Sequence, residues 1–404
     1  MTVIAPQAGD VQGEWKTIGL VGLAHGTSHF FHLLLVPLFP VFAREFGLSW
    51  TELGLLVSLF YLVSGVGQAA SGFLVDRVGG RPVLLAALLC FALASVAAGL
   101  AQGPGGLLAA AVLAGLGNAP FHPADFSILN QRVSLSRLGH AYSVHGISGN
   151  LGWALTPAFA LGIWQATGAW RWVYAGSALL ALAVLALLLW QRRWLHTGAL
   201  QRAAQGEAAA LAFLRLPSVW LAFSFFLCST AAVAAIQSFA APALAALHQA
   251  PVERMALLVT AYMLAGALGM LMGGFWVARS GVRLERNIAL ALAAAMMLFV
   301  LATLPGLSEQ AALALVALAG IGTGLAGPSR DLLVKQAAPP GATGRVYGAV
   351  YSGLDVGFAI GAPLAGALLD AALPRGVLWL AAAWLGLALL AAQAVAHWTG
   401  RRAG

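Results

Sequence analysis

The stretch "GFLVDRVGGR" at residues 72–81 joins two apolar runs, and it recurs as "GFWVARSGVR" at residues 274–283, an offset of 202. Further along, an ordered series repeats at an offset of 205, in which Gly115, Gly117, Pro123, Gly139, Tyr142 and Gly152 match Gly320, Gly322, Pro328, Gly344, Tyr347 and Gly357. Single glycine matches are common in a chain with 48 glycines, but an ordered series across three helices and a loop is not. The chain therefore contains two copies of one unit, an arrangement typical of secondary transporters.

The composition indicates a membrane protein. The chain has 404 residues, of which 61% are hydrophobic and 8% charged, whereas a soluble domain has about 25% charged residues. Its apolar runs are continuous and roughly 20 residues long, which fits membrane helices and not the alternating strands of a barrel. We predict an all-α integral membrane protein with twelve transmembrane helices in two six-helix, pseudo-symmetric halves.

The expected spans can be read directly from these apolar runs. They cover residues 16–42, 52–75, 82–101, 106–130, 139–165, 169–190, 215–246, 254–278, 287–305, 310–333, 344–370 and 375–398. The longest polar interruption lies in the middle of the chain. We therefore expect an N-terminal half over 1–190, a cytoplasmic linker over 191–214 and a C-terminal half over 215–404.

The basic residues predict the orientation. If the N-terminus is cytoplasmic, the inner tails and loops carry 17 of the 21 Lys and Arg residues, and the outer loops carry only Arg44, Arg171, Arg254 and Arg375. This bias supports an even number of spans, with both termini in the cytoplasm of a bacterial-type inner membrane. The net charge of +8 is then explained by basic loops, so no nucleic-acid partner is expected.

The stretch at 72–81 also carries a resemblance to a known family. Its pattern of Gly72, Asp76, Arg77, Gly79 and Arg81 resembles the signature loop of the major facilitator superfamily. From the residues alone, Asp76 could cap a neighbouring helix N-terminus, and the arginines could be simple cytoplasmic anchors. The resemblance implies that the loop latches the two halves together, with Asp76 pairing with Arg132 or the start of span 11. Ala278 replaces this acid in the second copy, so a latch there should be weaker or purely steric.

A narrower resemblance lies in spans 1, 4 and 5. Phe121-His122-Pro123, and the run from Gly149-Asn150 to Pro157, resemble the fosmidomycin-resistance branch of that superfamily, as does "SHFFHLLLVPLFPVFAREFGLS" in span 1. This chain departs from the branch in two places. Leu33 follows His32 where an acid is expected, and the acid after His-Pro is displaced to Asp125. The resemblance implies export of a toxic compound or metabolite.

Span 1 carries three histidines, His25, His29 and His32, at spacings of four and three. On a helix these positions lie within about 60° of one another, so they form one stripe. Ionisable groups within the membrane cost roughly 2.5–3.5 kcal/mol and are candidates for function. In the family implied above, span 1 lines the central cavity. We expect His25 and His29 to contact substrate or protons and His32 to be interfacial; structural hydrogen bonds are the alternative.

Other polar residues also fall within the spans. His122 and His145 lie in spans 4 and 5, and each is a candidate for either a functional or a structural role. Pro123 could kink span 4. Asn150 lies near mid-depth, and its repeat mate Asp355 is a buried acid that could exchange protons near neutral pH or form a structural hydrogen bond.

Three charged residues, Asp125, Arg330 and Asp331, lie toward the predicted cytoplasmic ends of spans 4 and 10. They could pair across the two halves as an inner gate. Alternatively, they could be end residues that extend their charges to the membrane surface.

These features predict a proton-coupled secondary transporter and not an enzyme, without cofactor or structural metal, acting as a monomer on a small-molecule substrate in the lipid bilayer. Protonation of His25 or His29 and of Asp355 on the outer side would drive the cycle. Abundant imidazoles and scarce acids favour an anionic or amphipathic substrate, with export as the leading direction. The alternatives are uptake of an organic anion by symport, a receptor without transport, and transition-metal transport through the histidine stripe. Span 1 itself offers no Cys or acid to complete a metal site.

Overall fold

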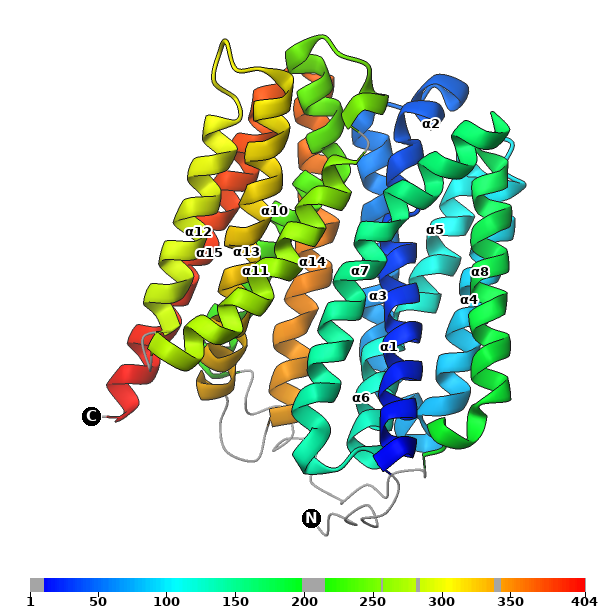
Figure 1. Ribbon diagram of the computed structural model, residues 1–404, viewed down its shortest axis with the longest axis vertical. Helices are drawn as coiled ribbons and strands as arrows, with labels where there is room; N and C mark the ends of the chain where they lie inside the picture. The colour runs from blue at the N-terminus through cyan, green and yellow to red at the C-terminus, as the bar shows by residue number, and fades with distance from the viewer. Residues whose placement is uncertain (1–10, 198–214, 256, 281–283, 338–342, 404) are drawn as a thin grey trace. The chain divides into compact units, whose positions relative to one another are not determined.

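The computed structural model describes residues 11–197, 215–255, 257–280, 284–337 and 343–403, and over these residues it contains helices and no strand (Figure 1). In the first part of the chain these are α1 (Val11–Leu33), η1 (Val36–Leu38), α2 (Phe39–Phe46), α3 (Trp50–Val78), α4 (Gly80–Gly99), α5 (Pro104–Asn118), α6 (Phe121–Arg132), α7 (Leu135–Thr167), α8 (Arg171–Trp190) and η2 (Arg192–Leu195). The second part contains α10 (Pro217–His248), η4 (Val252–Met255), α11 (Leu258–Ser280), α12 (Leu284–Leu301), α13 (Glu309–Ala337), α14 (Thr343–Asp370) and α15 (Pro374–Ala403). The predicted all-α class is confirmed.

Among the described residues, eleven helices are long and apolar enough to cross a membrane. The twelfth predicted span is α7, a helix of 33 residues. At about 1.5 Å per residue it is long enough to cross, but histidine, serine and asparagine side chains lower its hydropathy. This helix packs along the length of α1 (Figure 1). His145 and Thr156 of this helix are buried against protein, which is where a membrane helix can carry polar side chains.

The structure divides into two compact units, each with its own packing. The N-terminal unit comprises the described residues of Met1–Val41 and Leu62–Ala203, and the C-terminal unit those of Phe42–Tyr61 and Ala204–Gly404. Helix α3 contributes to both units, because its first part, as far as Tyr61, belongs to the C-terminal unit. The predicted linker falls mostly on residues 198–214, which lie outside the described residues.

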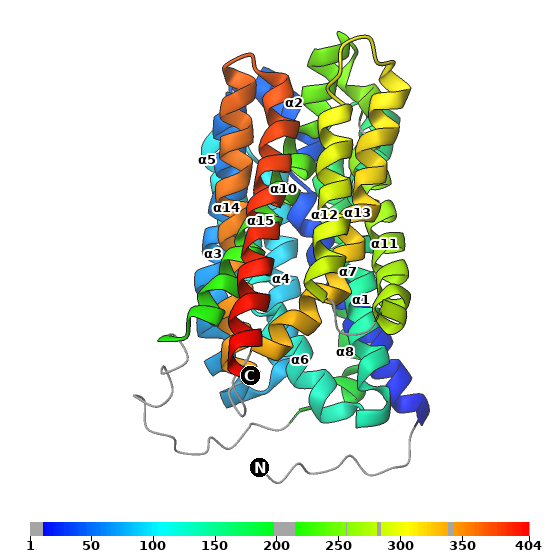
Figure 2. The same ribbon diagram turned by 90° about the vertical axis from the view of Figure 1, so that its left-hand side faces the viewer.

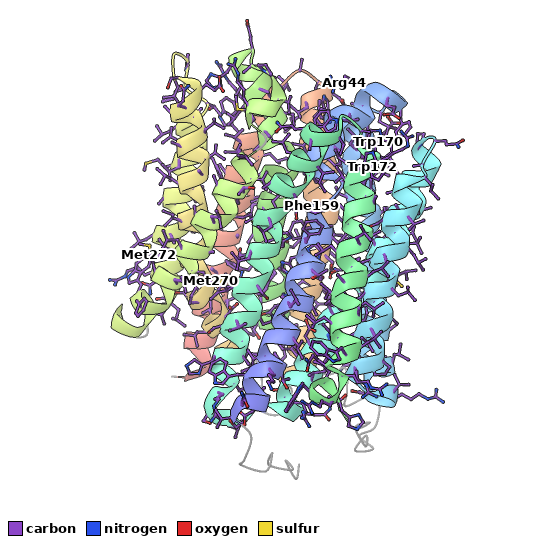
Figure 3. All side chains as sticks on the ribbon, turned by 45° about the vertical axis from the view of Figure 1, so that its right-hand side comes forward. Arg44, Phe159, Trp170, Trp172, Met270 and Met272 are labelled. Carbon is purple, nitrogen blue, oxygen red and sulfur yellow. The ribbon has the colours of Figure 1, made fainter. Side chains whose placement is uncertain are left out.

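In the N-terminal unit, α1 packs against α7, and α4 packs against α5 and α8. Aromatic rings fill the space between these helices. Phe31 stacks on Phe91 with ring centroids 4.3 Å apart, and Phe159, labelled in Figure 3, packs edge-on against Phe30 at 5.0 Å. Such pairs contribute about 0.5–1.5 kcal/mol each beyond their burial. They fix α1 in register with its neighbours.

In the C-terminal unit, α10 packs against α14 and α15, while α13 packs against α11 and α12 (Figure 2). This unit also holds the first turn of α3, where Asp370 of α14 accepts hydrogen bonds from the backbone N–H groups of Trp50 and Thr51 at 2.9 and 2.8 Å. The next two N–H groups, of Glu52 and Leu53, donate to Ser49. The N–H groups that a helix start leaves without partners are thus all satisfied here.

The motif at 72–81 is almost entirely helical. Residues as far as Val78 form the last turns of α3, and Gly79 alone makes the turn to α4, with a φ of +85° that favours glycine. The prediction that Asp76 caps a neighbouring helix is wrong for α4, because the N–H of Gly80 donates to Thr197 Oγ1 at 2.8 Å. Among the described residues, no hydrogen bond or ion pair joins Asp76 to Arg132. The start of span 11, its other expected partner, lies outside the residues whose side chains are described.

Candidate functional site

The histidine stripe of α1 forms a continuous row of rings. The ring centroids of His25 and His29 lie 4.4 Å apart, and those of His29 and His32 lie 4.6 Å apart. The spacing of four and three residues predicted this row, because side chains at i, i+4 and i+7 share one helix face. His25 is buried, and His29 and His32 are half-buried. The row therefore faces protein and not lipid.

Helices α6 and α7 bring two further imidazoles and an acid to this row. The ring of His145 stacks on that of His25 with centroids 3.4 Å apart, and His122 lies edge-on to His25 at 5.3 Å. Five of the nine histidines of the chain thus gather in one place. We call His25, His29, His32, His122, His145 and Asp125 the histidine cluster.

Asp125 lies between His25 and His145 and is 0% exposed. Its Oδ2 atom is 3.1 Å from Nε2 of His145, a hydrogen-bonding contact, and 3.3 Å from Nδ1 of His25. We expected this acid at a membrane surface or in a gate with Arg330 and Asp331. Its burial excludes a surface role, and its partners belong to the cluster. Arg330 instead pairs with its neighbour Asp331 at 2.9 Å.

The other end of the row is held by a hydrogen-bond network around Asn118 of α5. Asn118 Oδ1 accepts from Ser28 at 2.5 Å and lies 2.7 Å from Nε2 of His32, while its amide donates to Ser64 at 2.8 Å. The indole of Trp153 donates to Nδ1 of His32 at 3.3 Å. Because indole only donates, Nδ1 is the acceptor and Nε2 carries the proton of a neutral ring. These two contacts fix the His32 ring in one tautomer.

Sequence reasoning did not select Asn118, Ser28, Ser64 or Trp153. One signal for Asn118 was available, because an asparagine near the end of the apolar run 106–118 is a polar residue at membrane depth. Its partners come from α1 and α3, and no spacing within a single span indicates them. Gln68, whose Oε1 lies 3.1 Å from Nδ1 of His122, was missed for the same reason.

The predicted fourth span is interrupted where it meets the cluster. Helix α5 ends at Asn118 and α6 begins at Phe121, so the break falls at Ala119 and Pro120. The expected kink at Pro123 is thus displaced, and Pro123 lies in the first turn of α6, where a missing N–H is tolerated. Backbone breaks at membrane depth occur where protein surrounds them. This one places Asn118 and His122 on separate helices that face the same row of rings.

Glycines make room for the rings. A Cβ atom on Gly149 would lie 2.7 Å from Cε1 of His29 and 3.2 Å from Nε2 of His25. One turn further along α7, a Cβ atom on Gly152 would overlap the carbonyl oxygen of Gly26. Such close approach of backbones is the usual role of small residues between membrane helices. Asn150, between these two glycines, bonds the carbonyl of Gly146 on its own helix at 3.2 Å.

Three atoms of the cluster have no hydrogen-bond partner among the described residues: Nδ1 of His25, Nδ1 of His29 and Oδ1 of Asp125. A buried polar atom without a partner costs about 1–3 kcal/mol, and more if it is charged. Most buried polar groups are satisfied. Three such atoms within one cluster make the cluster a candidate binding site for a ligand, an ion or a proton.

In the C-terminal unit, Asp355 lies on α14 with 9% of its surface exposed. One residue before it, the carbonyl of Leu354 accepts a hydrogen bond from Thr230 of α10 at 3.1 Å. Among the described residues, Asp355 belongs to neither of the two groups of side chains that could hold a metal ion. Its environment thus differs from that of Asp125, although both are buried acids.

The comparison with known families agrees with this architecture. The sequence profile described as Major Facilitator Superfamily matches residues 21–240 and 222–403, which together cover nearly the whole chain. The chain belongs to the major facilitator superfamily. This is a family of membrane transporters and not generally of enzymes, so the chain is a multi-pass membrane protein.

Two curated relatives within this superfamily share similar parts of the chain. The Fosmidomycin resistance protein of Escherichia coli (strain K12) is 32% identical over 182 residues, which cover 44% of this chain and 43% of that protein. The Multidrug resistance protein B homolog of Mycobacterium tuberculosis (strain ATCC 25618 / H37Rv) is 28% identical over 180 residues, covering 43% and 32%. The chain matches less than half the length of each. The resemblance to the fosmidomycin-resistance branch is confirmed.

A solved structure of the same superfamily fold covers almost the entire chain. It is the crystal structure of a bacterial homolog to the human lysosomal transporter Spinster, with a TM-score of 0.75 and 15% identity, covering 95% of this chain and 98% of that one. At this identity the likeness concerns the fold alone. The twelve-helix fold of the superfamily is thereby supported over the full length.

Proposed function

We propose that this superfamily member is a proton-coupled antiporter that exports a small anionic or amphipathic molecule across a bacterial inner membrane, with both termini in the cytoplasm. The observation that carries the proposal is the contact of Asp125 with His25 and His145. A carboxylate buried between two imidazoles can hold a shared proton and release it when the site opens to water. Secondary transporters built from two repeats work by alternating access, which would expose such a site to each side of the membrane in turn.

The members of the cluster have separate roles in this proposal. His25, His145 and Asp125 carry the proton, because Oδ2 of Asp125 lies 3.3 Å from a ring nitrogen of His25 and 3.1 Å from one of His145. His29 and His122 extend the row toward the substrate. His32 positions the row, since both of its ring nitrogens are already engaged. Asp355 is a second, separate proton site.

The substrate class follows from the balance of charge in the N-terminal unit. The cluster contains five imidazoles and one acid, so a protonated state carries net positive charge and attracts an anion. A curated relative named for fosmidomycin resistance supports export of a toxic small molecule. Uptake of an organic anion by symport uses the same groups and differs only in the sign of coupling.

The experiment uses purified protein in liposomes. A thermal-stabilisation screen of small organic anions, with fosmidomycin included, is followed by flux of the best hit under an imposed pH gradient. Antiport predicts accumulation in vesicles with an acidic interior, whichever way the protein is inserted, because protons leave as substrate enters. Symport predicts accumulation when the exterior is acidic.

The matched variants are Asp125→Asn and His145→Gln, with His140→Gln as control, because His140 is an exposed histidine on the same helix as His145. We expect the first two to lose gradient-driven accumulation and the control to retain it. Accumulation that ignores the gradient in the wild-type protein would contradict proton coupling. Stabilisation by organic cations alone would contradict the proposed substrate class.

A further inference from the structure

We infer that His25, His145 and Asp125 form a binding site for a divalent first-row transition-metal ion within the N-terminal unit. Each residue offers one ligand atom, and these atoms all lie within 4.8 Å of one another. Two imidazoles and one carboxylate are a recognised ligand set for such ions, with positions left open for a further ligand. The site is not visible in any one span, because α1, α6 and α7 each supply a single ligand.

The distances between ligand atoms fit an ion. Metal–ligand bonds of about 2.0–2.2 Å place neighbouring ligands roughly 3.0–3.5 Å apart in octahedral or tetrahedral sites. The two contacts of Asp125 Oδ2, at 3.3 Å to His25 and 3.1 Å to His145, fall in this range. The contact with His145 alone would fit a hydrogen bond equally well. The contact with His25 does not have hydrogen-bond geometry, and Nδ1 of His25 remains without a partner among the described residues.

Burial and charge support the same conclusion. All three ligands are buried, and Asp125 is fully so. An ionised carboxylate in such a place needs a counter-charge, and its Oδ1 atom has no hydrogen-bond partner among the described residues. Two imidazolium ions with rings stacked at 3.4 Å would repel each other strongly. A divalent ion bound by two neutral imidazoles satisfies the carboxylate without this repulsion.

A second set of ligand atoms, from His25, His29 and His122, lies beside the first and shares His25. It contains no acid, so an ion there keeps its full charge in an apolar surrounding. His29 and His122 are also only half-buried. The set that contains Asp125 is therefore the better metal site of the two, because its carboxylate can balance the charge of the ion.

This site uses the side chains of the proposed transport function but does not depend on transport. Imidazole ligands must be deprotonated to bind a metal, so protons and the metal ion compete for the same atoms. The apparent affinity for the metal ion should therefore fall as the pH is lowered.

The test uses full-length detergent-purified protein carrying an affinity tag without histidines, with Co²⁺ and Zn²⁺ as the probes. We expect visible absorption bands of bound Co²⁺, displacement of these bands by Zn²⁺, and a single ion per chain by elemental analysis. Mg²⁺, which prefers oxygen ligands, should neither compete nor stabilise the protein.

Four variants assign the ligands. Asp125→Asn and His145→Gln should weaken Co²⁺ binding by more than the ~10–100-fold that loss of a supporting residue causes. His29→Gln, from the second set, tests whether that set contributes, and the exposed His140→Gln should bind as the wild type does. Size-exclusion profiles and metal-free unfolding temperatures identify any variant that has failed to fold. The pH dependence of the wild-type protein tests the site without any substitution.

Three outcomes would overturn the inference: no Co²⁺ bands in the wild-type protein, unchanged binding in both Asp125→Asn and His145→Gln, or an affinity that does not depend on pH. The two proposals can fail separately. Proton-driven anion flux without metal binding would remove this site and leave the transport function. Metal binding without any proton-driven flux would remove the proposed transport function and leave the metal site.

Discussion

Two helix crossings in this protein share a backbone design but not a chemistry. In the N-terminal unit, Gly152 of α7 meets the backbone of α1; in the C-terminal unit its repeat mate Gly357 of α14 meets Leu227 and Thr230 of α10. Each crossing also has a threonine that bonds a carbonyl of the partner helix, Thr156 in the first and Thr230 in the second. The glycines thus belong to the shared scaffold, whereas the threonines come from opposite partners, α7 in the first crossing and α10 in the second.

The side chains that project from the two crossings differ. The first is filled with imidazoles and Asp125, and the second carries the single acid Asp355 at the position matching Asn150. Among the described residues, the first crossing therefore holds several titratable side chains and the second holds one. Variants at the two crossings can test whether this difference matters for transport.

The largest expected effect concerns the two buried acids. Asp125→Asn should reduce proton-driven flux to the level of protein-free vesicles, since it removes the acceptor between two imidazoles. Asp355→Asn should slow the flux but leave it measurable. Both are assayed in the same pH-gradient experiment. The asymmetry between the units would be refuted by an active Asp125→Asn protein together with an inactive Asp355→Asn protein.

The next effect concerns the shared scaffold, where the two units should respond alike. Gly152→Ala and Gly357→Ala should each lower the free energy of unfolding by about 3 kcal/mol, because the added methyl group overlaps a neighbouring backbone. The measurement is reversible unfolding in detergent. Gly162→Ala on α7 is the control, since nothing lies within 4 Å of its Cβ position. A loss at only one of the two crossings would show that the scaffold is not equivalent.

A smaller effect is expected when the stability loss at Asn118 is compared with the loss at its repeat mate, Thr323. Asn118 bonds side chains of α1 and α3, whereas the Thr323 hydroxyl lies 3.1 Å from that of Tyr262. Asn118→Ala should therefore cost about 2 kcal/mol and Thr323→Val about 1 kcal/mol. Unfolding in detergent gives both values. Equal losses would mean that the network around His32 adds no stability.

The smallest effect belongs to the cap on α3. Asp370→Ala leaves the N–H groups of Trp50 and Thr51 without their acceptor and should cost about 1 kcal/mol. The unfolding temperature of the full-length protein reports this loss. Asp331→Ala, which removes an exposed acid paired with its neighbour, should leave that temperature unchanged. If both variants unfold alike, the cap is not what holds this helix start.

Most of the helical architecture could be predicted from the sequence, because lipid forces long apolar runs into helices. The span expected at 310–333 is α13 (Glu309–Ala337), and that expected at 82–101 is α4 (Gly80–Gly99). The break before α6 was expected three residues too late. The chain there contains Pro120 and Pro123, and spacing alone does not show which of them ends a helix.

The candidate site was only partly predictable. The stripe of His25, His29 and His32 followed from helical periodicity, which is a local property. The contact of Asp125 with His25 depends on how α6 packs beside α1, and no pattern within either helix encodes it. At the start of α4, the acceptor is Thr197 and not Asp76, and Thr197 lies too far along the chain for a local pattern to indicate it.

The order of the ligands along the chain has a consequence for biosynthesis. Asp125 and His145 are 20 residues apart on a helical hairpin, whereas the α1 residue Ser28 meets Asn118 across 90 residues. Domains form from the N-terminus during synthesis, so α1 enters the bilayer long before α6 exists. An imidazole on α1 can stay in the bilayer in its neutral form, whereas a carboxylate on α1 would enter the bilayer with its charge at neutral pH. Because the acid lies on α6, the first helix can insert into the bilayer without the cost of a charged carboxylate. The histidine cluster then forms only after α6 and α7 have been synthesised.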